Sequence, residues 1–260
     1  MKEGNQAAQF TESARKAARA EKEQPAIRLL RSRLFLVGLI ITIGAFGVLT
    51  ALVKRFPTWD IDVAFSRALQ SFTWEPWGWL MHFVSWIGFT PQNAIISGLV
   101  IFIIFILGWY WEAVSAGIAG ALTMTVNFVA KNPIDRPRPT ADLVEVFWHL
   151  EDFSFPSGHV MYFVGFFGFV FYLLYSLIKP SRKRTAALVA LVLLIALVGF
   201  SRIWLGQHWM SDVLGAYLLG MLTLVASIVI YRWGKPRFFT HQPVGGDEDK
   251  PESDPIIRGL

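Results

Sequence analysis

The sequence predicts an all-α, polytopic integral membrane protein: a bundle of six transmembrane helices with interfacial helices on the outer side. Three observations predict this fold class. Hydrophobic residues make up 54% of the 260 residues and charged residues 17%, whereas soluble domains have a charged fraction of about 25%. Six uncharged apolar runs follow one another too closely to leave room for a second core. A tryptophan-rich segment separates the first run from the second.

Each apolar run approaches the length that a membrane span requires. Crossing a hydrocarbon core of about 30 Å takes about 20 apolar residues in a helix, and fewer where neighbouring helices or flanking side chains help. The runs cover residues 34–53, 92–107, 113–130, 160–178, 185–201 and 213–231. An even number of spans places both ends of the chain on the same side of the membrane.

Basic side chains beside the spans indicate which side that is. Cytoplasmic loops hold the excess of lysine and arginine. The segments assigned to the cytoplasm contain Arg28, Arg31, Arg33, Lys179, Arg182, Lys183, Arg184, Arg232, Lys235 and Arg237. Lys54 and Arg55 do not follow this rule. We therefore expect a plasma-membrane protein with cytoplasmic tails at residues 1–33 and 233–260 and one membrane domain at residues 34–232.

Residues 57–89 are predicted to lie on the outer surface as interfacial helices. The segment begins with apolar residues at helical spacing, among them Ile61, Phe65 and Phe72, and continues with Trp74, Trp77, Trp79 and Trp86. Tryptophan at this density is typical of the headgroup level of a membrane. A packed lid or a seventh, partial span is the alternative interpretation.

Charge and cysteine usage exclude several classes of function. The net charge of +5 comes from basic residues that cluster beside the apolar runs, where they meet anionic headgroups, so we expect no nucleic-acid partner. The chain has no cysteine, which excludes disulfides, thiolate metal sites and a cysteine nucleophile. Oligomeric state is left open.

Polar residues gather in the three connections on the outer side. "KNPIDRPRP", "FPSGH" and "SRIWLGQHWMSD" each lie where an apolar run begins or ends. Ionisable groups at such depth are costly and indicate function. Lys131, Arg138 and Arg202 are cations suited to phosphate oxygens. The backbone N–H groups around Ser157 and Gly158, at the start of a helix, would add donors for an anion.

Two histidines complete this outer cluster. His208 and Asp212 are four residues apart, so on one helix they would share a face, with the carboxylate holding one imidazole nitrogen and the other free to attack. His159 comes from another loop and could protonate a leaving oxygen. The arrangement calls for no metal and no cofactor. We expect most of the remaining charges of the outer loops to be solvated, although Arg136 could instead bind a second phosphate. These charges are Asp135, Arg136, Asp142, Glu145, Glu151 and Asp152.

These motifs resemble those of the type 2 phosphatidic acid phosphatase (PAP2) superfamily of membrane lipid phosphatases. The signature consists of Lys with Arg-Pro seven residues on, then Pro-Ser-Gly-His, then Ser-Arg with His and Asp at fixed spacing. In this chain its positions are Lys131, Arg138, Pro139, Pro156, Ser157, Gly158, His159, Ser201, Arg202, His208 and Asp212. The resemblance covers roughly residues 34–231 and excludes both tails.

The resemblance implies a reaction and a role for each residue. His208 would attack phosphorus to form a phosphohistidine, Asp212 would orient the His208 ring, and His159 would protonate the leaving group. The other signature residues would bind the phosphoryl oxygens: Lys131, Arg138, Arg202, Ser157 and Gly158. The substrate would be a lipid phosphate or diphosphate, such as undecaprenyl diphosphate, phosphatidylglycerol phosphate or phosphatidate.

Soluble vanadium-dependent haloperoxidases share the motifs, but six spans argue against that activity. A transporter or binding protein for lipid phosphates is the alternative from another class, and it would not require the His208–Asp212 pair.

Overall fold

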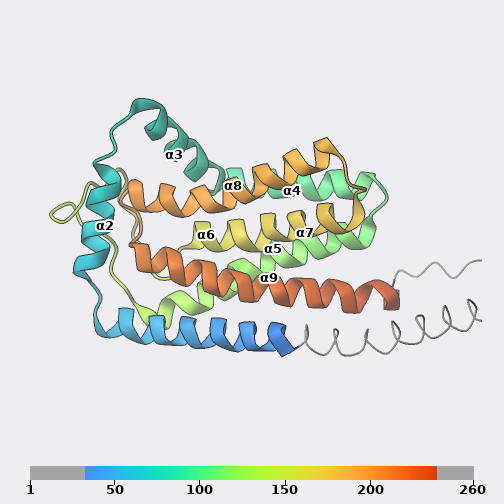
Figure 1. The fold of residues 1–260 in the computed structure, drawn as a ribbon, viewed down its shortest axis with the longest axis horizontal. Coiled ribbons are helices and arrows are strands. Elements are labelled where there is room, and N and C mark those ends of the chain that lie inside the picture. Colours follow the sequence, from blue (N-terminus) through green and yellow to red (C-terminus); the bar gives the residue numbers. More distant parts are fainter. Residues whose placement is uncertain (1–32, 239–260) are drawn as a thin grey trace, which may run out of the picture.

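The computed structural model describes residues 33–238, and within them every regular element is helical (Figure 1). The first helix covers Arg33–Arg55. The others are α2 (Asp60–Gln70), α3 (Glu75–Ile87), α4 (Gln92–Ile106), α5 (Tyr110–Ile134), α6 (Gly158–Tyr162), the π-helical turn η1 (Phe163–Phe167), α7 (Gly168–Leu177), α8 (Arg182–Trp204) and α9 (Met210–Phe238). The two tails expected at residues 1–33 and 233–260 fall almost entirely outside the described residues.

Among residues 33–238, five helices are long and apolar enough to cross a membrane: Arg33–Arg55, α5, the continuous stretch Gly158–Leu177, α8 and α9. The expected second span is α4, whose 15 residues extend only about 22 Å at 1.5 Å per residue. α3 precedes α4 at an angle of 66°, and the bent pair brings the number of spans to six if it is counted as one. The predicted all-helical membrane architecture is thus confirmed, with a bend in place of a straight second span.

The tryptophan-rich segment forms helices, as expected, and there are two of them, α2 and α3. α2 lies across one end of the bundle, and α3 leans outward from the same end (Figure 1). On α3, Trp79 is 72% exposed and Phe83 is 57% exposed, so the helix presents large apolar side chains to its surroundings. The N-terminal side of Arg33–Arg55 and the C-terminal side of α9 both lie at the opposite end of the bundle.

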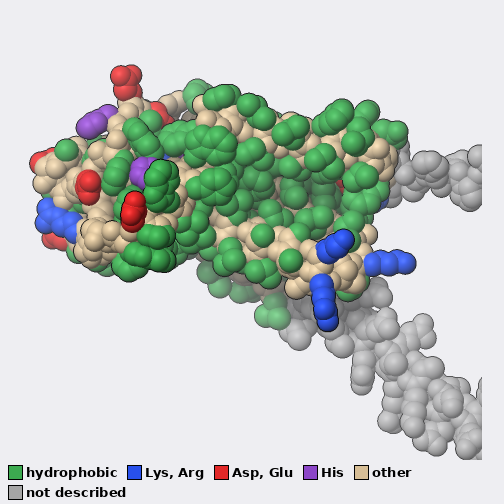
Figure 2. Space-filling view, turned by 90° about the horizontal axis from the view of Figure 1, so that it is seen from above, with side chains coloured by type: hydrophobic (Ala, Val, Ile, Leu, Met, Phe, Trp, Pro, Cys, Tyr) green, Lys and Arg blue, Asp and Glu red, His purple; other side chains and the backbone are tan. Residues whose placement is uncertain are grey.

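The stretch from α6 to α7 lies at the centre of the bundle. In its most apolar 18-residue window 61% of the residues are buried, against 6% for Arg33–Arg55. Its residues, including the phenylalanines Phe163, Phe166 and Phe169, form the centre of the hydrophobic core. Figure 2 shows that hydrophobic side chains also cover the flank of the bundle, as expected of a surface in contact with lipid. The chain is therefore a membrane protein whose core is built around one helix.

Candidate active site

A small cavity of about 250 Å³ lies at the end of the bundle near α2. Six of the eight predicted site residues line it: Lys131, Arg138, Gly158, His159, Arg202 and His208. Ser157 and Asp212 are buried behind the cavity wall instead. The backbone N–H of Ser157 is directed to the carbonyl of Asp212 at 3.4 Å, so it does not point into the cavity as the sequence analysis expected.

Local backbone features end the helices at this cavity. α5 stops just after Lys131 because Asp135 takes the left-handed conformation, with φ of 56°, which Asp tolerates better than most residues. α8 stops just after Arg202, where Gly206 has φ of 66°. A Cβ at Gly206 would lie 2.0 Å from the carbonyl oxygen of Glu145. Only glycine fits this turn, which carries the chain from Arg202 to His208.

His208 lies in the connection before α9 and not on the helix itself. The expectation that His208 and Asp212 share one helix face is therefore wrong. The Arg138 guanidinium lies 3.2 Å from His208 Nε2. Because arginine can only donate, Nε2 is the acceptor and carries the lone pair. The proton of the imidazole is then on Nδ1.

Ser154 stands between His208 and Asp212. Its hydroxyl lies 3.4 Å from His208 Nδ1 and donates to Asp212 Oδ2 at 2.5 Å. The direct distance from Nδ1 to Asp212 Oδ2 is 3.6 Å. Asp212 therefore acts on the imidazole mainly through Ser154, and this favours the tautomer in which Nε2 carries no proton.

The surroundings keep His208 uncharged. Burial lowers its pKa well below the ordinary 6.5, and the cations Arg138, Arg202 and Lys131 lower it further, while Asp152 acts in the opposite direction. The imidazole is consequently neutral at neutral pH. A neutral imidazole with its lone pair directed into a cationic cavity is a suitable nucleophile for an anion such as a phosphate ester.

Lys131, Arg138 and Asp152 form a group that we call the open cluster. Lys131 pairs with the Asp152 carboxylate, and Arg138 donates to the same carboxylate at 2.5 Å. Burial raises the pKa of Asp152, but the hydrogen bonds and charges of Lys131 and Arg138 outweigh it and lower the value to about 2. The Asp152 side chain is 57% exposed. Asp152 is thus exposed, as expected of most loop charges, but it also holds two cations at the mouth of the site, which was not expected.

Three buried polar atoms at the site have no hydrogen-bond partner among the described residues: Ser157 Oγ, His159 Nε2 and Arg202 Nε. Arg202 is otherwise held by Ser85 Oγ at 2.5 Å. The His159 ring is edge-on to Phe89 at 4.6 Å between centroids. Orphaned buried donors are costly, and a phosphate in the cavity is an acceptor of the kind that Arg202 and His159 lack.

Behind the cavity lies a second ionic group, Asp62, Arg136 and Asp212, which we call the sealed cluster. Arg136 donates to Asp62 Oδ2 at 2.8 Å and to Asp212 Oδ1 at 2.5 Å, and all three side chains have 0% exposure. Ser211 donates its hydroxyl to Asp62 at 2.6 Å. Arg136 is thus neither solvated nor available for a second phosphate, which corrects both expectations for this residue. Four of the ambiguous charges are exposed as expected: Asp135, Asp142, Glu145 and Glu151.

The sequence analysis missed Asp62, Ser154 and the pairing of Asp152. Asp62 is the one residue of these with a visible signal, because it lies between Ile61 and Val63 on the amphipathic α2. Its side chain is completely buried, and a buried carboxylate on an interfacial helix calls for a cationic partner. That partner, Arg136, comes from a motif segment.

Several known proteins are similar to this chain. The model of the PAP2 superfamily matches residues 112–236. Phosphatidylglycerophosphatase B of Bacillus subtilis (strain 168) is 30% identical over 182 residues, which are 68% of this chain and 86% of the relative. The crystal structure of a transmembrane PAP2-type phosphatidylglycerolphosphate phosphatase from Bacillus subtilis superposes with a TM-score of 0.66 at 22% identity, over 78% of this chain and 98% of that one. Aquifex aeolicus LpxE superposes with a TM-score of 0.53 at 18% identity, over 67% and 98%.

Proposed function

Because this chain belongs to the PAP2 superfamily, a family of membrane phosphatases, we propose that it removes the terminal phosphate from a lipid phosphate or diphosphate. The substrates considered are undecaprenyl diphosphate, phosphatidylglycerol phosphate and phosphatidate. One observation carries the proposal: His208 Nε2 faces a cationic cavity while Ser154 and Asp212 hold Nδ1 from behind. A protein that only binds or transports lipid phosphates has no need of this backed imidazole.

The proposed reaction has two steps. In the first, the Nε2 lone pair of His208 attacks phosphorus, the bond from phosphorus to the lipid oxygen breaks, and His159 gives a proton to that oxygen. In the second, His159 takes a proton from water, the water oxygen attacks phosphorus, and the phosphohistidine bond breaks with return of its electron pair to Nε2. His208 and inorganic phosphate are regenerated.

Cations supply the charge stabilisation in this proposal. Lys131, Arg138 and Arg202 line the cavity, and phosphoryl transfer depends mainly on positioning and on stabilising the charge of the three non-bridging oxygens. The described residues contain no group of three or more His, Cys, Asp or Glu side chains arranged to hold a metal ion. Because Lys131, Arg138 and Arg202 are assigned the charge stabilisation, we propose hydrolysis that continues in EDTA, and the assay contains EDTA for this reason.

The first test is phosphate release by the purified protein in detergent with EDTA, for wild type and His208→Ala. His149→Ala is the matched control, because His149 is an exposed histidine of the neighbouring loop. We expect release from undecaprenyl diphosphate, phosphatidylglycerol phosphate or phosphatidate by wild type and His149→Ala, and none by His208→Ala. Release by His208→Ala would overturn the covalent mechanism. Binding of these lipids without release by wild type would favour the transport alternative.

The orientation is a second part of the proposal: both tails in the cytoplasm, the site on the extracytoplasmic face, and residues 34–232 as the catalytic membrane domain. It is supported by the basic residues Arg182, Lys183 and Arg184 at the end of the bundle away from the site. Because the chain has no cysteine, single cysteines at exposed Asp142 and Lys183 are unique labels. We expect an impermeant thiol reagent to label residue 142 from outside the cell and residue 183 only after the membrane is opened; the reverse pattern would overturn the orientation.

A further inference from the structure

Arg202 differs from the other two cations of the small cavity in having no carboxylate partner. Lys131 and Arg138 share the Asp152 carboxylate, whereas no Asp or Glu pairs with Arg202 among residues 33–238. Arg202 is nevertheless completely buried. A buried charge is costly unless an opposite charge or hydrogen bonds compensate it. The groups that hold Arg202 in place are therefore of interest.

Three uncharged side chains surround the Arg202 guanidinium. Nη1 donates to Ser85 Oγ at 2.5 Å, and Nη2 donates to Gln207 Oε1 at 3.3 Å. The Cζ atom lies 5.2 Å from the centre of the Phe89 ring, a distance at which an aromatic ring attracts a cation. We call Ser85, Gln207 and Phe89 the neutral cradle.

The neutral cradle leaves hydrogen-bond donors of Arg202 for an anion. A guanidinium has five N–H groups, and the cradle takes one on Nη1 and one on Nη2. Nε has no hydrogen-bond partner in the described part of the chain, and Arg202 lines the small cavity. A bidentate contact between a guanidinium and a phosphate is among the strongest hydrogen-bonded pairs in proteins. The held guanidinium is thus equipped for such a contact.

Ser85 comes from the inner side of α3. It is completely buried, whereas the neighbouring Trp86 is 50% exposed. Ser201, next to Arg202 on α8, donates to the carbonyl of Met81 on α3 at 2.5 Å. Two hydrogen bonds therefore attach α3 to the end of α8 that carries the guanidinium.

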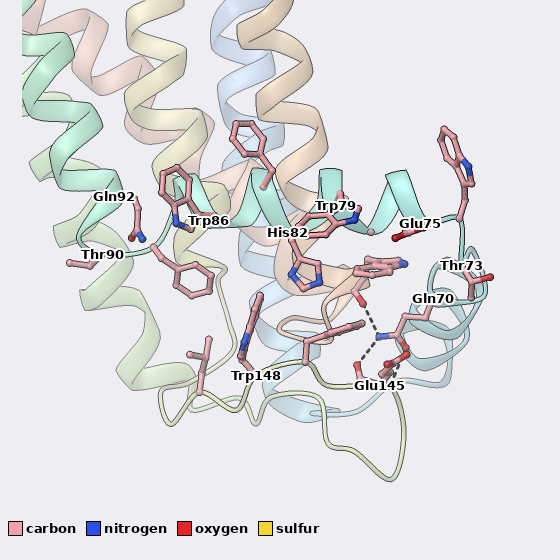
Figure 3. A pocket seen from close by; sticks show the side chains of 17 residues that line it. Gln70, Thr73, Glu75, Trp79, His82, Trp86, Thr90, Gln92, Glu145 and Trp148 are labelled. Carbon is pink, nitrogen blue, oxygen red and sulfur yellow. Dashed lines mark hydrogen bonds between the residues drawn. The ribbon is translucent and has the colours of Figure 1, made fainter.

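Gln207 comes from the connection between α8 and α9. Its backbone N–H donates to the carbonyl of Arg202 at 3.0 Å. Its side-chain amide nitrogen donates to the carbonyl of Trp148 at 2.6 Å, and Figure 3 shows Trp148 on the outer loop, opposite α3. Because a carbonyl only accepts, the amide nitrogen faces Trp148 and the amide oxygen faces Arg202. The outer loop thus fixes which end of the amide the guanidinium meets.

We infer that Ser85 and Gln207 are positioning residues, which aim Arg202 at the phosphoryl group and leave its charge uncompensated. This inference rests on the proposed function and adds two residues that the signature does not specify. A carboxylate in either place would pair with Arg202 and compete with phosphate, as Asp152 does for the other two cations. With uncharged holders, a phosphoryl group can bind Arg202 without displacing an anion.

The decisive comparison is between Gln207→Glu and Gln207→Met. Both variants keep the approximate length of the side chain and lose the donor to Trp148, but only Gln207→Glu places a carboxylate beside Arg202. The dependence of Tm on phosphate concentration in detergent gives the dissociation constant of inorganic phosphate without requiring turnover. We expect this constant to be at least tenfold higher in Gln207→Glu than in Gln207→Met. Equal constants would overturn the inference.

The Tm without phosphate separates a positioning role from damage to the fold. The introduced carboxylate gives a buried cation its counter-charge, so Gln207→Glu should melt no lower than Gln207→Met although it binds phosphate more weakly. Lower melting together with weaker binding would indicate damage and would overturn the inference.

Gln70→Glu is the matched control for the added carboxylate. Gln70 also donates to carbonyls of this region, those of Glu145 and Trp204 (Figure 3), but it does not line the small cavity. Its phosphate dissociation constant should stay within twofold of wild type. A rise equal to that of Gln207→Glu would show that any carboxylate near the outer loop weakens binding, and would overturn the inference.

The role of Ser85 is tested by Ser85→Ala, which removes the acceptor of Nη1 and adds no charge. We expect the phosphate dissociation constant to rise at least fivefold in the wild-type background and less than twofold in the Arg202→Ala background, because Ser85 acts through the guanidinium. Ser66→Ala is the matched control, since Ser66 is also buried on an outer helix and its hydroxyl has no partner among the described residues. Equal effects in both backgrounds, or in both serine variants, would overturn this role.

The inference and the proposed function fail on different results. Wild type that releases no phosphate from undecaprenyl diphosphate, phosphatidylglycerol phosphate or phosphatidate contradicts the proposed function, and the binding comparison still tests the neutral cradle. Release by wild type, together with equal phosphate affinity in Gln207→Glu and Gln207→Met, overturns the inference alone.

Discussion

The sealed cluster joins one arginine to two carboxylates, the open cluster joins one carboxylate to an arginine and a lysine, and the two differ in access to water. In the sealed cluster both carboxylates and the guanidinium have no exposed surface. In the open cluster the cations are almost buried, whereas the Asp152 side chain is 57% exposed. Breaking a buried pair leaves an uncompensated charge, but an exposed partner can be exchanged for water or another anion at little cost. The difference indicates that the sealed cluster fixes the position of Asp212. In the open cluster, a phosphate can replace Asp152 as the partner of the two cations.

The largest expected effect is on the free energy of unfolding, when the arginine of each cluster is replaced in turn. Arg136→Gln leaves Asp62 and Asp212 buried without a counter-charge and should lower the free energy of unfolding by about 3–5 kcal/mol. Arg138→Gln leaves the exposed Asp152 with Lys131 and water as partners, so it should lower the free energy of unfolding by a smaller amount, about 1–2 kcal/mol for the lost hydrogen bonds to the carbonyls of Asp152 and Gln207. Denaturation in detergent measures both. Equal losses would show that the two clusters do not differ as described.

The next effect concerns Asp62, which touches neither the cavity nor His208. Asp62→Asn should lower the free energy of unfolding by about 1–3 kcal/mol, because a charged hydrogen bond to Arg136 is lost in a buried site. It should also lower kcat more than it raises KM, since Asp212 loses its fixed position while the phosphate-binding cations remain. Asp60→Asn is the control: Asp60 is on the same helix and exposed. Steady-state kinetics that match in the two variants would assign no positioning role to the sealed cluster.

A smaller effect, of opposite sign, is expected in the open cluster. Asp152→Asn removes the anion that competes with phosphate for Lys131 and Arg138. The inhibition constant of inorganic phosphate should fall about fivefold, the equivalent of ~1 kcal/mol for one partly exposed ion pair. Inhibition assays at constant ionic strength measure this. Weaker inhibition in the variant would show that Asp152 positions the cations instead of competing for them.

The smallest effect is a shift of the pH profile. The low pKa of His208 keeps Nε2 unprotonated below pH 6.5, so kcat/KM should persist into that range and decrease only where the imidazole gains a second proton. Asp152 raises the His208 pKa, while burial and the cations lower it. Asp152→Asn should therefore move the acidic limb of kcat/KM to lower pH. The substrate is the same for both proteins, so a difference between their profiles reports the enzyme. A shift to higher pH would contradict the sign of this interaction.

The helices and the cavity lining follow from patterns that are local in the sequence. Uncharged runs predict spans because every residue of a span meets lipid or core. Lys131, His159 and Arg202 lie at helix ends, so the number of spans alone places them at one end of the bundle. The short α4 and its bend from α3 were not predicted, because the angle between two helices depends on contacts that hydropathy does not record.

The ion pairs inside the site follow from no local pattern. Asp62 is 74 residues from Arg136, and Arg136 is 76 residues from Asp212. Charge type alone does not tell which carboxylate is buried against Arg136 and which is exposed beside Arg138. For the same reason the sequence does not predict that Ser154 lies between His208 and Asp212.

The wide sequence separation within the sealed cluster has a consequence for how the protein is made. A ribosome produces the chain from its N-terminus, so the Asp62 carboxylate exists well before Arg136, and Arg136 well before Asp212. Until α9 joins the bundle, Asp62 and Arg136 have each other but lack the third member, and the imidazole of His208 has no carboxylate behind it. The nucleophile is thus aligned only after α9 has been synthesised, and a chain released before α9 would enter the membrane without a competent active site.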